Sequence, residues 1–78
     1  MTAQRIRSVI LQQTGIDPDV IGHDVEFLVG YKLDSLDFIN LVMRLEQEFD
    51  IKIPDADLPK LTTFKTTVEY VKTAKKSN

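Results

Sequence analysis

The segment from Asp34 to Phe49 constrains the fold more than any other part of the chain, because it carries the signals of one amphipathic helix. Asp34 is a favoured N-cap residue, and Asp37 stands three positions later, as in a capping box. Pro54 cannot continue a helix, so this helix must end before it. On a helical wheel of about 100° per residue, one apolar stripe lies roughly 140–240° from Leu36. This stripe predicts the core-facing side of the helix and comprises Phe38, Leu41, Val42, Leu45 and Phe49.

A second apolar row on the same helix falls at roughly 300–360° on this wheel and consists of Leu36, Ile39 and Met43. A helix packed on one side needs a single stripe, so the second row is either buried under another segment or exposed for a partner. The pattern alone does not choose between these alternatives. The residues that flank the row are polar or acidic, as at a transient protein interface: Asp37, Asn40, Glu46 and Gln47.

Apolar spacing predicts two further helices. The first runs from Thr2 to about Thr14, and the last begins at a threonine cap, Thr62 or Thr63, and fades near Ala74. These helices together predict an all-α fold, a small up-down helical bundle of three main helices plus one short helix.

The connections complete this fold. Residues 15–34 form a long loop after the first helix, punctuated by glycine and proline, and residues 55–58 are expected to form one short turn before Pro59. We expect one domain over residues 1–72 and a polar, disordered tail over residues 73–78.

Length and composition exclude several classes of protein. A chain of 78 residues holds one small domain with a thin core, and the lack of cysteine excludes disulfides and thiolate metal sites. No apolar run approaches the ~20 residues needed to span a bilayer, and the first residues show no signal-peptide pattern, so we expect a cytoplasmic protein without membrane insertion.

The charge is unevenly distributed along the chain. Residues 17–57 hold eleven acidic residues against three basic ones, a net charge of −8, whereas the whole chain carries −2. An acidic centre argues against nucleic acid, which requires a basic face. It suits a basic protein partner or simply a solvated surface.

Ser35 stands at the head of the central helix, beside the second apolar row. The first backbone N–H groups of a helix are unpaired and carry partial positive charge, so an attached anion such as a phosphodiester would be stabilised there. A serine at a helix start is, however, most often only a cap.

Four stretches together resemble the acyl carrier protein family over roughly residues 4–72. They are Asp34-Ser35-Leu36-Asp37 with Leu41-Val42-Met43 in the same helix, the run from Leu45 to Pro54, Leu61-Thr62-Thr63-Phe64 and Val68-Glu69-Tyr70-Val71. The resemblance implies a non-catalytic carrier. A phosphopantetheinyl transferase would move 4'-phosphopantetheine from coenzyme A onto Ser35, between Asp34 and Leu36, and the arm would hold acyl groups as thioesters. The acyl chain of such carriers can fold back between the helices.

The resemblance also implies a docking surface for acyl-loading and acyl-transferring enzymes that present basic surfaces. By matching positions, the apolar contacts are Leu36, Ile39 and Met43. The polar contacts are Asp34, Asp37, Asn40, Glu46 and Glu48. Two departures concern the segment before the serine, where Lys32 replaces the usual glycine and Tyr31 an aliphatic residue. A carrier for a specialised lipid or polyketide pathway is therefore as well supported as one for fatty acid synthesis.

Other functions remain open at this point. A peptidyl or aminoacyl carrier would share the fold and the modified serine, and an unmodified interaction module would use only the apolar row. Catalysis has weak support, because the one histidine, His23, lies in a loop with Asp24 and Glu26 and is expected to be simply exposed. Nothing in the sequence indicates an oligomer, so we expect a monomer.

Overall fold

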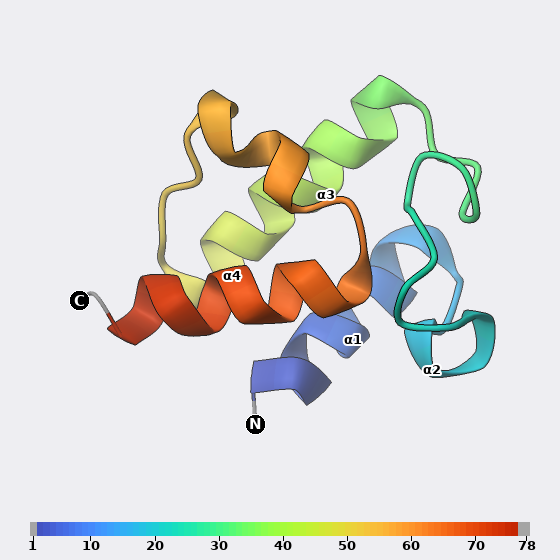
Figure 1. Ribbon diagram of the computed structural model, residues 1–78, viewed down its shortest axis with the longest axis horizontal. Helices are drawn as coiled ribbons and strands as arrows, with labels where there is room; N and C mark the ends of the chain where they lie inside the picture. The colour runs from blue at the N-terminus through green and yellow to red at the C-terminus, as the bar shows by residue number, and fades with distance from the viewer. Residues whose placement is uncertain (1, 77–78) are drawn as a thin grey trace.

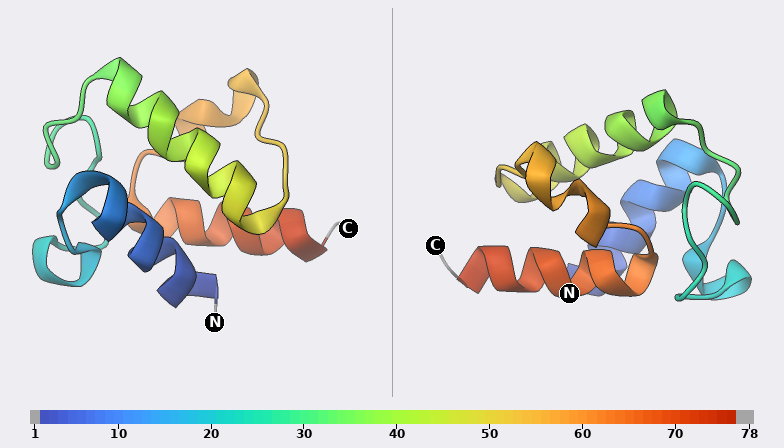
Figure 2. Two further views of the ribbon diagram at one scale, coloured as in Figure 1. Left: turned by 180° about the vertical axis from the view of Figure 1, so that it is seen from behind. Right: turned by 45° about the horizontal axis from the view of Figure 1, so that its top comes forward.

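The computed structural model describes residues 2–76 and is built of helices around one core (Figure 1). In chain order the elements are α1 (Thr2–Thr14), α2 (Pro18–Ile21), α3 (Ser35–Phe49), the 3₁₀ helix η1 (Asp55–Lys60) and α4 (Phe64–Lys76). The predicted all-α class and the three main helices are confirmed. In Figure 1, α4 crosses the front of the molecule, and the reverse view of Figure 2 places α1 and α3 in front of it.

The core is formed by the apolar stripes that spacing predicted. Four residues of the predicted α3 stripe are buried, and Ile6, Val9 and Ile10 of α1 pack in the same cluster. Phe38 is the exception in the stripe, since it is only half-buried and lies at the edge of the core. The contact between α1 and α3 is extended by Arg5, whose guanidinium lies 4.7 Å from the centre of the Phe49 ring.

The first half of the long connection is more ordered than the sequence predicts. It contains α2, which Asp17 caps by accepting the amide N–H of Asp19, while Pro18 occupies the first helical turn, where its missing N–H costs nothing. Arg7 of α1 holds Asp17 through a 2.6 Å ion pair, which lowers the pKa of the Asp17 carboxyl and raises that of the Arg7 guanidinium. The ion pair ties this part of the connection to α1.

The second half of the connection is fastened to the start of α4. Phe27 is buried, and its N–H donates to the carbonyl of Thr62 at 2.8 Å. Gly30 folds back on Glu26, with its N–H 2.7 Å from the Glu26 carbonyl. A Cβ atom on Gly30 would lie 1.9 Å from a methyl group of Val25, so any larger residue here would force the Val25 side chain to move.

Two boundaries differ from the predicted ones. The turn expected over residues 55–58 continues through Pro59 to Lys60, because the fixed φ of proline suits a 3₁₀ helix. Helix α4 extends to Lys76, so residues 73–76 of the expected tail are helical, and residues 77–78 lie outside the described residues.

Candidate functional site

Ser35 is the first residue of α3, but it does not cap the helix. Asp34 does so, in extended conformation, with its Oδ1 accepting the N–H of Asp37 at 2.8 Å. The Asp34 carbonyl accepts the N–H of Phe38 at 3.0 Å. Ser35 is exposed, and within residues 2–76 its hydroxyl has no hydrogen-bond partner. The capping alternative for Ser35 is therefore excluded by Asp34.

This geometry leaves a free hydroxyl at the positive end of a helix of 15 residues. A phosphodiester on the Ser35 oxygen would lie close to the unpaired amides of the first helical turn. No base contacts the hydroxyl within the described part of the chain.

The segment before Ser35 is held by Tyr31. Its ring is 4% exposed and packs edge-on against Phe27, with the ring centres 5.0 Å apart. The Tyr31 hydroxyl is buried without a hydrogen-bond partner among residues 2–76. Burial raises the pKa of this hydroxyl, and the charge of Asp17 adds to the effect. Sequence reasoning recorded Tyr31 only as a departure and missed its anchoring role.

Lys32 follows in the left-handed conformation, with φ of 57°, which favours glycine. The backbone therefore takes the conformation that glycine would supply, although lysine occupies the position. Gly30 does not share this role, since its φ is not positive and its lack of a side chain instead leaves room for Val25.

The second apolar row of α3 is exposed along its length. The exposed fractions are 68% for Leu36, 37% for Ile39 and 50% for Met43. The alternative that another segment covers this row is wrong. We call these three residues the α3 row; it begins beside Ser35 and extends along the helix.

The polar residues expected around this row divide into two groups. Asp37 and Asn40 are exposed beside it. Glu46 is half-buried and accepts the N–H of Ile53 at 2.7 Å, so it holds the connector after α3. Glu48 pairs with Arg5 of α1 at 3.0 Å and lies within 3.9 Å of Arg44. Asp37 and Asn40 therefore lie on the same exposed surface as Ser35 and the α3 row, whereas Glu48 belongs to the contact between α3 and α1.

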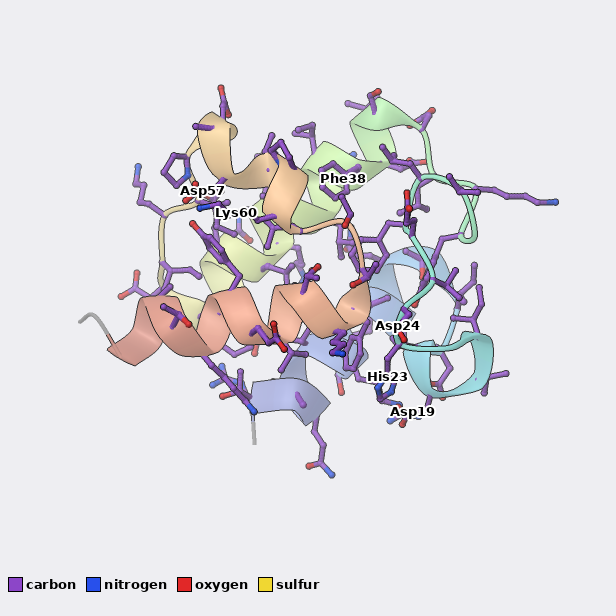
Figure 3. All side chains as sticks on the ribbon, in the orientation of Figure 1. Asp19, His23, Asp24, Phe38, Asp57 and Lys60 are labelled. Atoms are coloured by element: carbon purple, nitrogen blue, oxygen red, sulfur yellow. The ribbon has the colours of Figure 1, made fainter. Side chains whose placement is uncertain are left out.

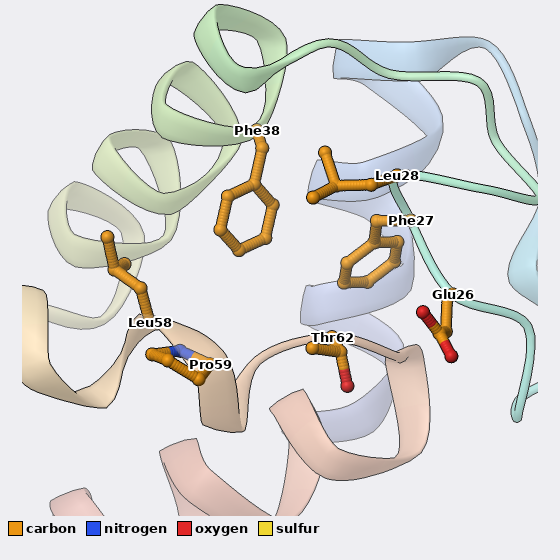
Figure 4. Close-up of a pocket in the computed structure, with 7 residues that line it drawn as sticks. All are labelled: Glu26, Phe27, Leu28, Phe38, Leu58, Pro59 and Thr62. Carbon is orange, nitrogen blue, oxygen red and sulfur yellow. The ribbon is translucent and has the colours of Figure 1, made fainter.

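A cavity of about 240 Å³ opens beside Phe38, one turn beyond Ser35 (Figure 4). The loop, α3, η1 and the segment before α4 each contribute to its lining, which is mainly apolar: Glu26, Phe27, Leu28, Phe38, Leu58, Pro59 and Thr62. Sequence reasoning placed Phe38 in the core stripe. The helical position was correct, but the cavity depends on segments that converge only in the fold.

The region around His23 shows no metal site. Its Nε2 lies 2.7 Å from Asp19, and its ring packs on Phe64 with the ring centres 4.7 Å apart. Asp24 lies nearby in the chain (Figure 3), yet residues 2–76 contain no group of three potential metal ligands. Within the same residues, no helix is long and apolar enough to cross a membrane.

Comparison with known proteins identifies the family to which this small helical domain belongs. The family model described as "Phosphopantetheine attachment site" matches residues 4–71. A protein of Zymomonas mobilis subsp. mobilis named "Acyl carrier protein" is 40% identical over 70 residues, 90% of each chain. One of the same name from Bdellovibrio bacteriovorus is 39% identical over 67 residues, 86% of each chain.

The chain belongs to the acyl carrier protein family. It is a non-catalytic carrier with a covalently attached 4'-phosphopantetheine group, and it interacts with a phosphopantetheinyl transferase and with biosynthetic enzymes.

Proposed function

We propose that Ser35 is the residue to which phosphopantetheine is attached. The observation that carries this proposal lies at the start of α3, where Asp34 caps the helix and the Ser35 hydroxyl is left exposed and unpaired. Asp34 and Leu36 flank the attachment point on either side. The attached group supplies a terminal thiol that holds the cargo as a thioester.

The cargo that fits this chain best is an acyl group. The cavity beside Phe38 is lined mainly by apolar side chains, so an acyl chain that enters it gains about 0.8 kcal/mol per buried CH₂ group. A peptidyl or aminoacyl cargo would bring polar amides, and a mainly apolar lining leaves most of them unpaired. We therefore place the protein in fatty acid biosynthesis or in a specialised lipid or polyketide pathway.

The partner enzymes dock, in this proposal, on the α3 row. Leu36, Ile39 and Met43 provide an exposed apolar centre, and Asp37 and Asn40 lie at its edge. An apolar centre with an acidic edge suits a partner whose basic side chains surround an apolar contact. Glu46 adds negative charge near the far end of the row, although its carboxylate is engaged with the Ile53 N–H.

The test is transfer of the arm from coenzyme A by a broad-specificity phosphopantetheinyl transferase, followed by intact mass. We expect one adduct on the wild type and on Ser8→Ala, which changes an exposed serine of α1. Ser35→Ala should fold normally and gain none. An adduct on Ser35→Ala would refute the assignment. Failure of both a broad and a cognate transferase on folded wild type would favour an unmodified interaction module.

Reconstitution separates the pathways. A housekeeping carrier should support a reconstituted fatty acid synthase, and this chain, if it serves the same pathway, should support it at a comparable rate. A rate far below the housekeeping carrier's, from fully loaded protein, would assign the chain to a specialised pathway.

A further inference from the structure

The 3₁₀ helix η1 separates two spaces in the molecule. On one side it forms a wall of the apolar cavity, with Leu58 and Pro59 facing Phe38 (Figure 4). On the other side an open groove of about 570 Å³ lies between η1 and α4. Its lining residues are Lys60, Thr66, Glu69, Tyr70, Thr73 and Ala74. A displacement of η1 into this groove would enlarge the cavity.

The helix η1 is loosely packed but firmly anchored at both ends. Asp57 and Leu58 are half-buried, and the rest of η1 is exposed. Before it, Ile53 is buried and donates its N–H to Glu46, and after it, Leu61 is 1% exposed. An element with few buried contacts between two fixed ends can move as a unit without unfolding its neighbours.

One side-chain hydrogen bond ties η1 to α4 across the groove. The Tyr70 hydroxyl donates to Oδ2 of Asp57 at 2.6 Å. Lys60 lies beside Asp57 on η1 (Figure 3), with its Nζ 3.4 Å from Oδ1. The bond raises the pKa of Tyr70 to about 12 and lowers that of Asp57, as expected for a short bond to a carboxylate.

We propose that this hydrogen bond, which we call the latch, sets the length of acyl chain that the cavity accepts. With the latch closed, η1 is fixed and the cavity stays near 240 Å³. The bonded Asp57 carboxylate and Tyr70 ring span the gap between η1 and α4 and keep the two helices apart. A longer chain can enter only when this bond breaks, the two side chains rotate aside and η1 moves toward α4. Asp57 and Tyr70 are then specificity-determining residues that act on the cavity wall without touching the thioester. This inference rests on the proposed function, since it requires cargo carried on Ser35.

The experiment loads straight acyl groups of increasing length onto the arm and confirms each loading by intact mass. The rate of thioester cleavage by added hydroxylamine then reports how far each chain is sequestered. While chains still fit, each added CH₂ should slow cleavage by about fourfold, and the decline should end where the cavity is full.

The variants are Tyr70→Phe, which deletes one oxygen, and Asp57→Ala, which deletes its acceptor. Asp55→Ala is the matched control, because Asp55 is an exposed acid on the same helix. In both latch variants the cleavage rate should go on falling at chain lengths where it has levelled off in the wild type. In the control it should level off at the same chain length as in the wild type.

Several results would overturn the latch. These are an unchanged endpoint in either latch variant, an equal shift in the control, or no sequestration of any chain by loaded wild type. The last leaves the carrier function intact, because intact mass has already shown that the arm and its cargo are attached.

A second readout needs no cargo. The N–H of Asp57 donates to the carbonyl of Pro54 at 2.9 Å, and the N–H of Leu61 donates to the carbonyl of Leu58 at 3.0 Å. Hydrogen exchange at these two amides should accelerate in both latch variants, while exchange in α3 stays unchanged. Unchanged exchange at these amides would contradict the proposal even if the arm could not be attached.

Discussion

Replacing Tyr31 by phenylalanine should stabilise the protein, although it removes a polar group from a natural side chain. The Tyr31 ring is 4% exposed, and its hydroxyl has no hydrogen-bond partner among residues 2–76. In the unfolded chain the same hydroxyl is hydrated. Folding therefore desolvates it without replacing the lost bonds, at a cost of about 1–3 kcal/mol.

The expected gain is near the lower end of that range. The phenylalanine ring keeps the edge-on contact with Phe27, and the lost oxygen leaves a small void that costs about a few tenths of a kcal/mol. We expect the free energy of unfolding to rise by about 1 kcal/mol, which raises Tm by about 4–8 °C in a domain of this size. Circular dichroism during thermal and urea unfolding measures both quantities.

Tyr70→Phe is the matched control, because it deletes the same atom from a half-buried tyrosine whose hydroxyl has a partner, Asp57. This variant should lower Tm. If Tyr31→Phe also lowered Tm, the buried hydroxyl would have a satisfied partner, such as an ordered water, and the reasoning would be refuted.

Three further predictions follow from individual contacts. Lys32→Gly should raise the free energy of unfolding by up to about 1 kcal/mol in urea titrations, because it relieves a lysine with φ of 57°; a loss of stability would show that the Lys32 side chain makes a stabilising contact. Spectroscopic titration should show Tyr70 ionising near its folded pKa of about 12. The stability that the protonated Tyr70 contributes is fully present below pH 10.0 and is lost as pH rises through about 12. Asp57→Ala should bring the Tyr70 pKa back toward 10.0, and an unchanged Tyr70 pKa would contradict the hydrogen bond to Asp57. Asp37→Lys should slow association with a partner enzyme in stopped-flow kinetics, most strongly at low salt. Glu48→Lys should mainly lower Tm, because Glu48 pairs with Arg5 of α1. Equal slowing of association by both variants would show that the docking surface extends to Glu48.

The main helices could be predicted because residues close to each helix end determine where the helix starts or stops. Asp34 and Asp37 marked the start of α3, and the helix ends at Phe49 as predicted. The short helix α2 could not be found from periodicity, since four residues show none. Its cap, Asp17, is held by an ion pair to Arg7, which joins segments that meet only in the fold.

The site was predictable in part for the same reason. The position of Ser35 at a helix head follows from Asp34, and the α3 row follows from the helical wheel. Exposure of the row depends on where the loop and η1 lie, which no local pattern determines. Glu46 and Glu48 were both predicted as docking contacts, yet their carboxylates meet the Ile53 N–H and Arg5, whose approach to α3 is a tertiary contact.

The central claim is that Ser35 carries the arm, and fragmentation of the intact protein tests it directly. The protein is co-expressed with a phosphopantetheinyl transferase and fragmented in the mass spectrometer without prior digestion. The account predicts that every fragment containing Ser35 carries the mass of one phosphopantetheine group and that fragments lacking Ser35 do not. An adduct on any other residue, or its absence from folded protein treated with a cognate transferase, would contradict the account.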